Sequence, residues 1–380
     1  MKRSILLASM VLTACATTLP VPGALPPLAR SLPLHKVWTY ADAVESERVR
    51  ARQPLAASDC CVYWVDGAGF ITAFDAARGR TLWRVDTAGR ASSGVGVAPD
   101  VLYVGTRDGD VLALNPVDGA QRWRTRVSSE VIAAPTGAKD IVVAHTVDGK
   151  VVALSASDGH MLWTYEGKVP LLSLRGVSSP VIENDQVLVG LASGHLIALK
   201  LWDGTENWQV ELAAARGRSE LERMVDADVT PRVRNGVVFA AAYHGRIAAI
   251  DIRSGRTVWT RDLSSSLGLA LDNDNVYVTD NDGVIWAMAQ GTGTVLWKQD
   301  ELSGRGVTAP AAVGGQIVVG DRGGYLNWLQ GDTGQFTHRL FVESAPVDNG
   351  AVVHRGVLYT ATRGGVIDAF ELRNVAPGQP

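Results

Sequence analysis

The phrase "GDVLALNPVDGAQRW" at residues 109–123 decides the fold, because near copies of it recur along the chain. Each copy starts at an opening glycine, and six of the eight have a second glycine ten residues later and a tryptophan four residues after that. The opening glycines are Gly69, Gly109, Gly149, Gly194, Gly245, Gly283, Gly324 and Gly365. They lie 38 to 51 residues apart, and repetition at such a period is typical of a repeat architecture.

Each copy predicts a strand, a turn and a returning strand. "DVLAL" has the apolar pattern of a strand, and "NPVDG" supplies an Asn or Asp side chain and a glycine for a tight turn. Upstream, runs such as "DIVVAHTVDG" at 140–149 add two strands joined by an Asp-Gly hairpin. One repeat is therefore four antiparallel strands, the size of a propeller blade. We expect an all-β chain that forms an eight-bladed β-propeller of four-stranded antiparallel blades.

The two ends of the chain complement each other. The eighth copy, "GGVIDAFEL" at 364–372, lacks its tryptophan strand, whereas "HKVWTY" near the N-terminus carries Trp38 in a matching context. We expect the strand around Trp38 to complete the last blade and remove an open sheet edge. The propeller then spans 34–375, with a tail at 376–380. A seven-bladed ring with one irregular copy is the alternative.

The periodic tryptophans predict packing between blades rather than a ligand-binding cage, since periodic aromatic residues usually fill a core. The small Ala and Gly residues of the same phrase leave room for them. His338 takes this position in the seventh copy. The predicted docking residues are Trp83, Trp123, Trp163, Trp208, Trp259 and Trp297.

The first residues have the pattern of an export signal. Lys2 and Arg3 precede a short apolar run, and Leu12-Thr13-Ala14-Cys15 resembles the lipobox of bacterial lipoproteins. That resemblance implies a signal peptide at 1–14, lipid attachment at Cys15 and, because no Asp follows Cys15, the periplasmic face of the outer membrane. Residues 15–33 are Pro-rich and have the composition of a flexible tether. An ordinary signal peptide cleaved nearby is the alternative.

The charge argues against nucleic-acid binding, and the absence of catalytic motifs argues against an enzyme. The formal net charge is −3 with no basic stripe, and the seven histidines are scattered without metal-ligand spacing. We therefore predict no catalytic residues, no metal site and no cofactor. The pattern A-x-D-x-x-x-G-x-x-x-W nevertheless resembles the docking repeat of quinoprotein dehydrogenases, which bind pyrroloquinoline quinone. A periplasmic enzyme of that kind is the alternative function.

Cys60 and Cys61 are neighbours in a stretch that reads as a strand, "CCVYWVDG". Adjacent side chains of a strand point to opposite faces of the sheet. We expect two separate thiols. A bond between the two neighbours, which an oxidising compartment permits but which needs a distorted peptide, is the alternative.

Two consecutive connections between blades are longer than the others. The path from tryptophan to the next opening glycine is 31 residues after Trp163 and 37 after Trp208, against 24 to 27 elsewhere. Insertions of this kind mark loops on a binding face. The first connection, 167–180, contains three leucines and an arginine; the second, 211–231, contains a predicted helical turn ("SELERM") and two aspartates. They predict a protein-binding patch. The alternative is that the leucines pack beneath the loop and the charges are solvated.

With the leucine-arginine motif "LSLRG" and the acidic motif "DADVTP" in neighbouring loops, the chain resembles the β-propeller lipoproteins of the outer-membrane β-barrel assembly (BAM) complex. The resemblance covers essentially the whole mature chain and departs from the pattern at Ala227, with Leu171 widening the apolar stretch. It implies a non-enzymatic scaffold whose loops bind the POTRA domains of BamA and assist insertion of β-barrel proteins. Unfolded outer-membrane proteins are a second kind of partner, and a lipoprotein scaffold with another partner is a further alternative. The residues carried over are Leu172, Leu174, Arg175, Asp226 and Asp228.

Overall fold

The structure, a computed structural model, describes Leu25, Leu28, residues 34–41 and residues 54–372, apart from 89, 171, 173, 175, 217 and 220–222. Every regular element in this part of the chain is a β-strand, and it contains no helix long and apolar enough to cross a membrane. The predicted signal peptide, Cys15 and most of the predicted tether lie outside the described residues.

Thirty-two strands form eight antiparallel sheets of four strands each. Blade 1 consists of β2 (Ala56–Ala57), β3 (Cys61–Val65), β4 (Phe70–Asp75) and β5 (Thr81–Asp86). Blade 2 consists of β6 (Ala91–Val97), β7 (Leu102–Thr106), β8 (Asp110–Leu114) and β9 (Gln121–Arg126). Blade 3 consists of β10 (Thr136–Ala138), β11 (Ile141–His145), β12 (Lys150–Ser155) and β13 (Met161–Glu166). Blade 4 consists of β14 (Val181–Glu183), β15 (Gln186–Gly190), β16 (His195–Lys200) and β17 (Glu206–Glu211).

The second half of the chain repeats this arrangement. Blade 5 consists of β18 (Arg232–Arg234), β19 (Val237–Ala241), β20 (Arg246–Asp251) and β21 (Thr257–Asp262). Blade 6 consists of β22 (Leu269–Leu271), β23 (Asn275–Thr279), β24 (Ile285–Ala289) and β25 (Val295–Gln299). Blade 7 consists of β26 (Ala311–Val313), β27 (Gln316–Gly320), β28 (Tyr325–Gln330) and β29 (Phe336–Phe341). Blade 8 consists of β30 (Val352–His354), β31 (Val357–Ala361), β32 (Val366–Leu372) and β1 (Leu34–Ala41).

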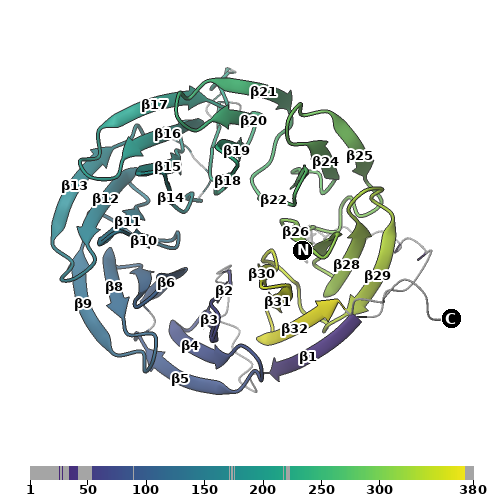
Figure 1. Cartoon of the computed structure of the whole chain (residues 1–380), viewed down its shortest axis with the longest axis horizontal. Coiled ribbons are helices and arrows are strands. Elements are labelled where there is room, and N and C mark those ends of the chain that lie inside the picture. Colours follow the sequence, from purple (N-terminus) through teal and green to yellow (C-terminus); the bar gives the residue numbers. More distant parts are fainter. Residues whose placement is uncertain are drawn as a thin grey trace, which may run out of the picture.

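The blades stand in a ring around a central axis, with the first strand of each innermost and the last strand outermost (Figure 1). The purple β1 lies beside the yellow β32 and closes the ring. In that pair Trp38 lies opposite Ala369, which is the alanine–tryptophan pairing of six other blades. The predicted eight-bladed ring and its closure by the N-terminal strand are confirmed, and the seven-bladed alternative is wrong.

The hydrophobic core lies between the blades rather than within one of them. Between blades 1 and 2, Tyr63 and Trp83 pack against Leu102 and Val104. Seven further layers separate the other neighbouring blades. Because both faces of a middle strand are covered in this way, β8 is buried along its whole length. Continuous burial explains why such strands are apolar runs bounded by turn residues.

The periodic tryptophans join neighbouring blades. Trp208 is the one buried residue of the outer strand β17, and its indole N–H donates to the carbonyl of Ile252 in the next blade at 2.9 Å. Gly255 of that blade has a φ of +67° and lies against the indole, where a Cβ would come within 2.6 Å of the ring. A side chain there would displace the indole. The same bond to the next blade is made by Trp38, Trp83, Trp123, Trp163, Trp259 and Trp297.

In blade 7 the large residue of the alanine–tryptophan pair stands on β28 instead of on the outer strand β29. Trp328 takes the place of the usual alanine and lies opposite His338, with the two rings edge to face at 5.4 Å. Trp328 is 1% exposed, and burial lowers the pKa of His338. The large residue has moved from the outer strand to the neighbouring strand, so the blade remains filled.

The expectation of two separate thiols is wrong, because Cys60 and Cys61 form a disulfide bond. Strand alternation does not apply to this pair: Cys60 lies in the bend between β2 and β3, and only Cys61 belongs to β3. The sulfur atoms can therefore meet without facing opposite sides of one strand.

Candidate partner-binding rim

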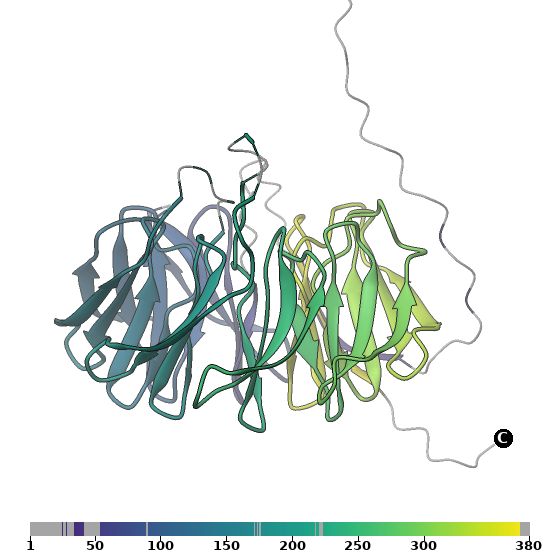
Figure 2. The same ribbon diagram turned by 90° about the horizontal axis from the view of Figure 1, so that it is seen from above.

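The two long connections lie on the same rim of the ring. The first joins β13 to β14 and the second joins β17 to β18, so each runs from an outermost strand to the innermost strand of the next blade. Antiparallel strand order places all such connections at one end of the blades. Figure 2 shows both rising above the ring on that side. We call this end of the molecule the loop rim.

The first connection presents apolar side chains to solvent. Val169 is 45% exposed and Leu172 is 47% exposed, whereas Leu174 is half-buried. Leu171 and Arg175 lie outside the described residues. For Leu172, the alternative that the leucines pack beneath the loop is wrong. Exposed apolar side chains are a kind of surface that protein partners cover.

The second connection lies against blade 5. Asp226 forms an isolated bridge with Tyr243, whose N–H donates to the Asp226 carbonyl at 2.7 Å. Ala227 is buried, and its N–H donates to the carbonyl of Leu191 in blade 4 at 3.2 Å. The predicted helical turn falls partly on 220–222, which lie outside the described residues. Around them, the N–H of Arg223 donates to the carbonyl of Ser219, but no helix is formed by the described residues.

Asp226 lies beneath the rim. Its side chain is buried, and neither carboxyl oxygen receives a well-aligned hydrogen bond. Burial raises the pKa of Asp226 far above its ordinary value, and the neighbouring Asp228 raises it further, while the backbone N–H of Leu174 partly offsets the shift. The raised pKa favours the protonated form of Asp226 at neutral pH. Its carboxyl faces the backbone of the first connection and not solvent.

Asp228 holds the two connections together by close contact. Its carboxyl lies against Gly176 so closely that a Cβ at that position would be 1.7 Å from Oδ2. Burial raises the pKa of Asp228, while the neighbouring Asp226 carboxyl opposes the shift. Nearby, the N–H of Ser179 donates to Oγ1 of Thr230 at 3.2 Å. The second connection therefore supports the first from below.

The sequence assigned both aspartates to a partner-binding patch. The structure brings them to the same place as Leu174 but puts Asp226 under the surface, where it does not contact solvent. The alternative that the charges are solvated does not hold for Asp226 either.

Sequence reasoning missed the residues that fasten the end of the first connection. The buried ring of His145 donates through Nδ1 to the carbonyl of Ser178 at 3.1 Å, and burial lowers the pKa of His145 to about 4, so the ring is neutral. Thr136 donates to the carbonyl of Pro180 at 2.7 Å. Neither residue stands in a motif, and only Gly176, directly after "LSLR", carried a signal of close approach.

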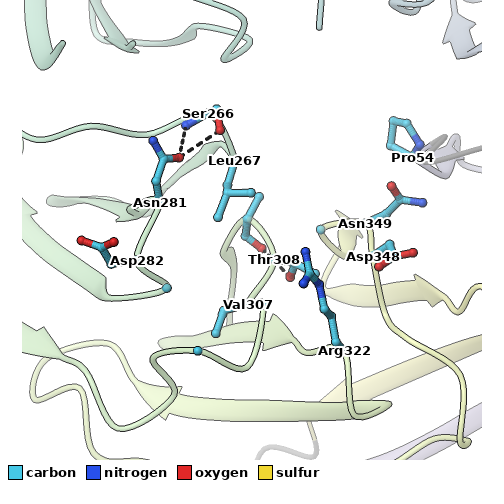
Figure 3. Close-up of a pocket in the computed structure, with 15 residues that line it drawn as sticks. Pro54, Ser266, Leu267, Asn281, Asp282, Val307, Thr308, Arg322, Asp348 and Asn349 are labelled. Carbon is cyan, nitrogen blue, oxygen red and sulfur yellow. Dashed lines mark hydrogen bonds between the residues drawn. The ribbon is translucent and has the colours of Figure 1, made fainter. Parts of the chain in front are cut away.

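A polar hollow of about 510 Å³ lies farther round the same rim, between blades 6, 7 and 8 (Figure 3). In it, Ser266 donates through its N–H and its hydroxyl to Oδ1 of Asn281, at 3.0 and 2.9 Å. Arg322 and Asp348 line the side toward blade 8. Within the described part of the chain, no group of three or more His, Cys, Asp or Glu residues is placed to hold a metal. The hollow therefore differs in chemistry from the apolar first connection.

Comparisons of sequence and of structure with known proteins point to the same family over most of the propeller. The sequence profile of the family described as "Outer membrane protein assembly factor BamB" matches residues 67–299 and 276–374. A relative of that name from Alkalilimnicola ehrlichii is 43% identical over 97% of this chain and 96% of its own. The crystal structure of BamB from Moraxella catarrhalis covers 89% of this chain and 99% of its own, with a TM-score of 0.81 and 28% identity.

Quinone-dependent enzymes share the architecture. A europium-containing methanol dehydrogenase has a TM-score of 0.71 over 89% of this chain and 93% of its own, at 12% identity. At that level of identity the likeness extends to the fold alone.

Proposed function

Because the chain belongs to the BamB family of outer membrane protein assembly factors, we propose that it is a non-enzymatic scaffold of the BAM complex. In this proposal the loop rim binds the POTRA domains of BamA and assists insertion of β-barrel proteins into the outer membrane. A lipid on Cys15 holds the propeller at the periplasmic face. Unfolded outer-membrane proteins are a second class of partner.

The observation that carries the proposal is the support beneath an exposed apolar loop. Leu172 is half exposed, and the connection that bears it is fastened from below by Asp228, by Thr230 and by His145. A connection that is fastened in this way loses less conformational freedom when a partner covers it. Exposed apolar side chains are a kind of surface that protein partners cover.

A pull-down from detergent-solubilised envelopes tests the proposal. BamA should co-purify with the wild-type chain and be lost with Leu172→Ala or Arg175→Glu. Removing a leucine that a partner buries costs about 1.5–3 kcal/mol, so binding of purified POTRA domains should weaken at least about tenfold. When cells are separated into membrane and soluble fractions, the Cys15→Ala variant should be lost from the membrane fraction.

Leu162→Ala is the matched control. Leu162 is 41% exposed, which is similar to the exposed fraction of Leu172. It stands on the outer strand β13, away from the loop rim. This variant should bind BamA as the wild type does. Equal binding by Leu172→Ala and Leu162→Ala, with both proteins folded, would reject the rim as the interface.

A further inference from the structure

The disulfide lies at the end of the molecule opposite the loop rim. It stands at the turn from β2 to β3, and strand direction places such turns away from the connections that join neighbouring blades. A cavity of about 690 Å³ opens there between blades 1 and 2. Neither the alanine–tryptophan packing nor the loop rim accounts for a disulfide at this place.

The two sulfur-bearing residues differ in access. Cys60 is exposed in the bend, whereas Cys61 is 4% exposed and belongs to the core layer of Tyr63 and Trp83. Both residues line the cavity. Exchange proceeds by attack of a thiolate on one sulfur, and the attacked sulfur has to be reachable. Only Cys60 offers that access.

The cavity suits a thiol carried on a small peptide. Its walls include Val97, Pro99, Pro116 and Val117, which can cover apolar groups. Ser58 lies beside Cys60, with its hydroxyl 3.5 Å from Sγ. Once Cys60 is a thiolate, that hydroxyl can donate to it and favour the charged form.

We propose that Cys60–Cys61 is a thiol–disulfide exchange site that takes peptide-borne thiols and is attacked at Cys60. The incoming thiolate forms a bond to Sγ of Cys60, the bond between Cys60 and Cys61 breaks, and Cys61 leaves as a thiolate that takes a proton from water. A second thiol then displaces Cys60, which is also protonated. In balance, two thiols are oxidised to a disulfide while the Cys60–Cys61 bond is reduced to two thiols.

Trapping with reduced glutathione tests the site of attack. The full-length protein is incubated with glutathione under native conditions, quenched with iodoacetamide and mapped by fragmentation of the peptide that holds both cysteines. The expected product carries glutathione on Cys60 and the alkyl group on Cys61. The reverse assignment would overturn the proposal, as would absence of any adduct under conditions that give one with the urea-unfolded protein.

Single variants supply a second measurement. In Cys61→Ser the remaining Cys60 thiol should react with Ellman's reagent at least about tenfold faster than the Cys61 thiol does in Cys60→Ser, because exposure and thiolate character control the rate. In urea the two rates should converge, which shows that the fold causes the difference. Equal rates in the native proteins would contradict the proposal. Both variants should keep BamA binding, since the site lies away from the loop rim, so this test and that of the proposed function fail independently.

Discussion

At the scale of single residues, Asp226 places an ionisable group where ionisation is costly. The carboxyl is buried beside a second carboxyl, and no donor aligns well with either oxygen. The low polarity of that site favours the protonated form over the charged one. A proton on Asp226 allows it to sit between Asp228 and the backbone of Leu174 without repulsion.

Asp226→Asn should keep both the fold and BamA binding, because the amide is neutral and has the shape of the protonated carboxyl. Asp226→Ala should weaken BamA binding, because it removes the group that lies between Asp228 and the backbone of Leu174. The folded chain binds the Asp226 proton more tightly than the unfolded chain does, because the pKa of Asp226 is raised in the fold. This contribution to the free energy of unfolding is complete below the ordinary pKa of 3.8 and is lost as the pH rises toward the raised pKa. Between about pH 5 and pH 9 the free energy of unfolding of the wild type should fall by at least about 1 kcal/mol relative to that of Asp226→Asn. Urea unfolding at several pH values measures this difference. Parallel pH profiles for the two proteins would show that Asp226 is ionised in the fold.

At the scale of elements, the first connection depends on the second. The contacts are a carboxyl against Gly176, the bond from Ser179 to Thr230 and the backbone of Leu174 near Asp226. None of these involves a strand-to-strand hydrogen bond. The shape of the loop rim can therefore change while the blades below it stay intact.

Gly176→Ala isolates that dependence. The new Cβ would overlap the carboxyl of Asp228, so one connection has to move, and the amide of Leu174 should exchange its hydrogen faster. BamA binding should fall at least about tenfold with little change in the unfolding midpoint. Gly291→Ala is the control, because a Cβ there meets no atom within 4 Å. Identical exchange and binding in the two variants would mean that the connections are independent.

At the scale of the whole molecule, the ring is held shut by one strand from the N-terminal end. β1 pairs with β32, and Trp38 packs over Gly79 of blade 1 while donating to the carbonyl of Ala76 at 2.8 Å. The buried Asp368 accepts from Lys36 and Thr39 at 3.2 and 2.5 Å. Contacts between residues more than 300 positions apart thus join the ends of the ring.

Trp38→Ala should open this closure. Loss of a buried tryptophan costs about 3–5 kcal/mol, and the freed β1 strand should become an early site of proteolysis. Trp202→Ala should change stability by no more than about 0.5 kcal/mol, since Trp202 is 58% exposed. Unfolding by urea together with limited proteolysis measures both effects. If the two variants behaved alike, Trp38 would not be the closing residue.

The sequence by itself determined the ring. Strand, turn and tryptophan recur at short range within each copy, and the incomplete eighth copy together with Trp38 predicted the closing strand. These features depend on backbone preferences and on side-chain size, which are local properties. The same patterns also predicted which connections are long and that Leu172 lies in one of them.

Only the tertiary structure decided the protonated state of Asp226, the fit of Asp228 on Gly176 and the bond between Cys60 and Cys61. The first two depend on groups about 50 residues apart, and a pKa follows from the water that such neighbours remove. The third depends on where a bend gives way to a strand, and a run of apolar letters does not reveal that boundary. Desolvation and close contact arise from the packed molecule and are absent from any single segment.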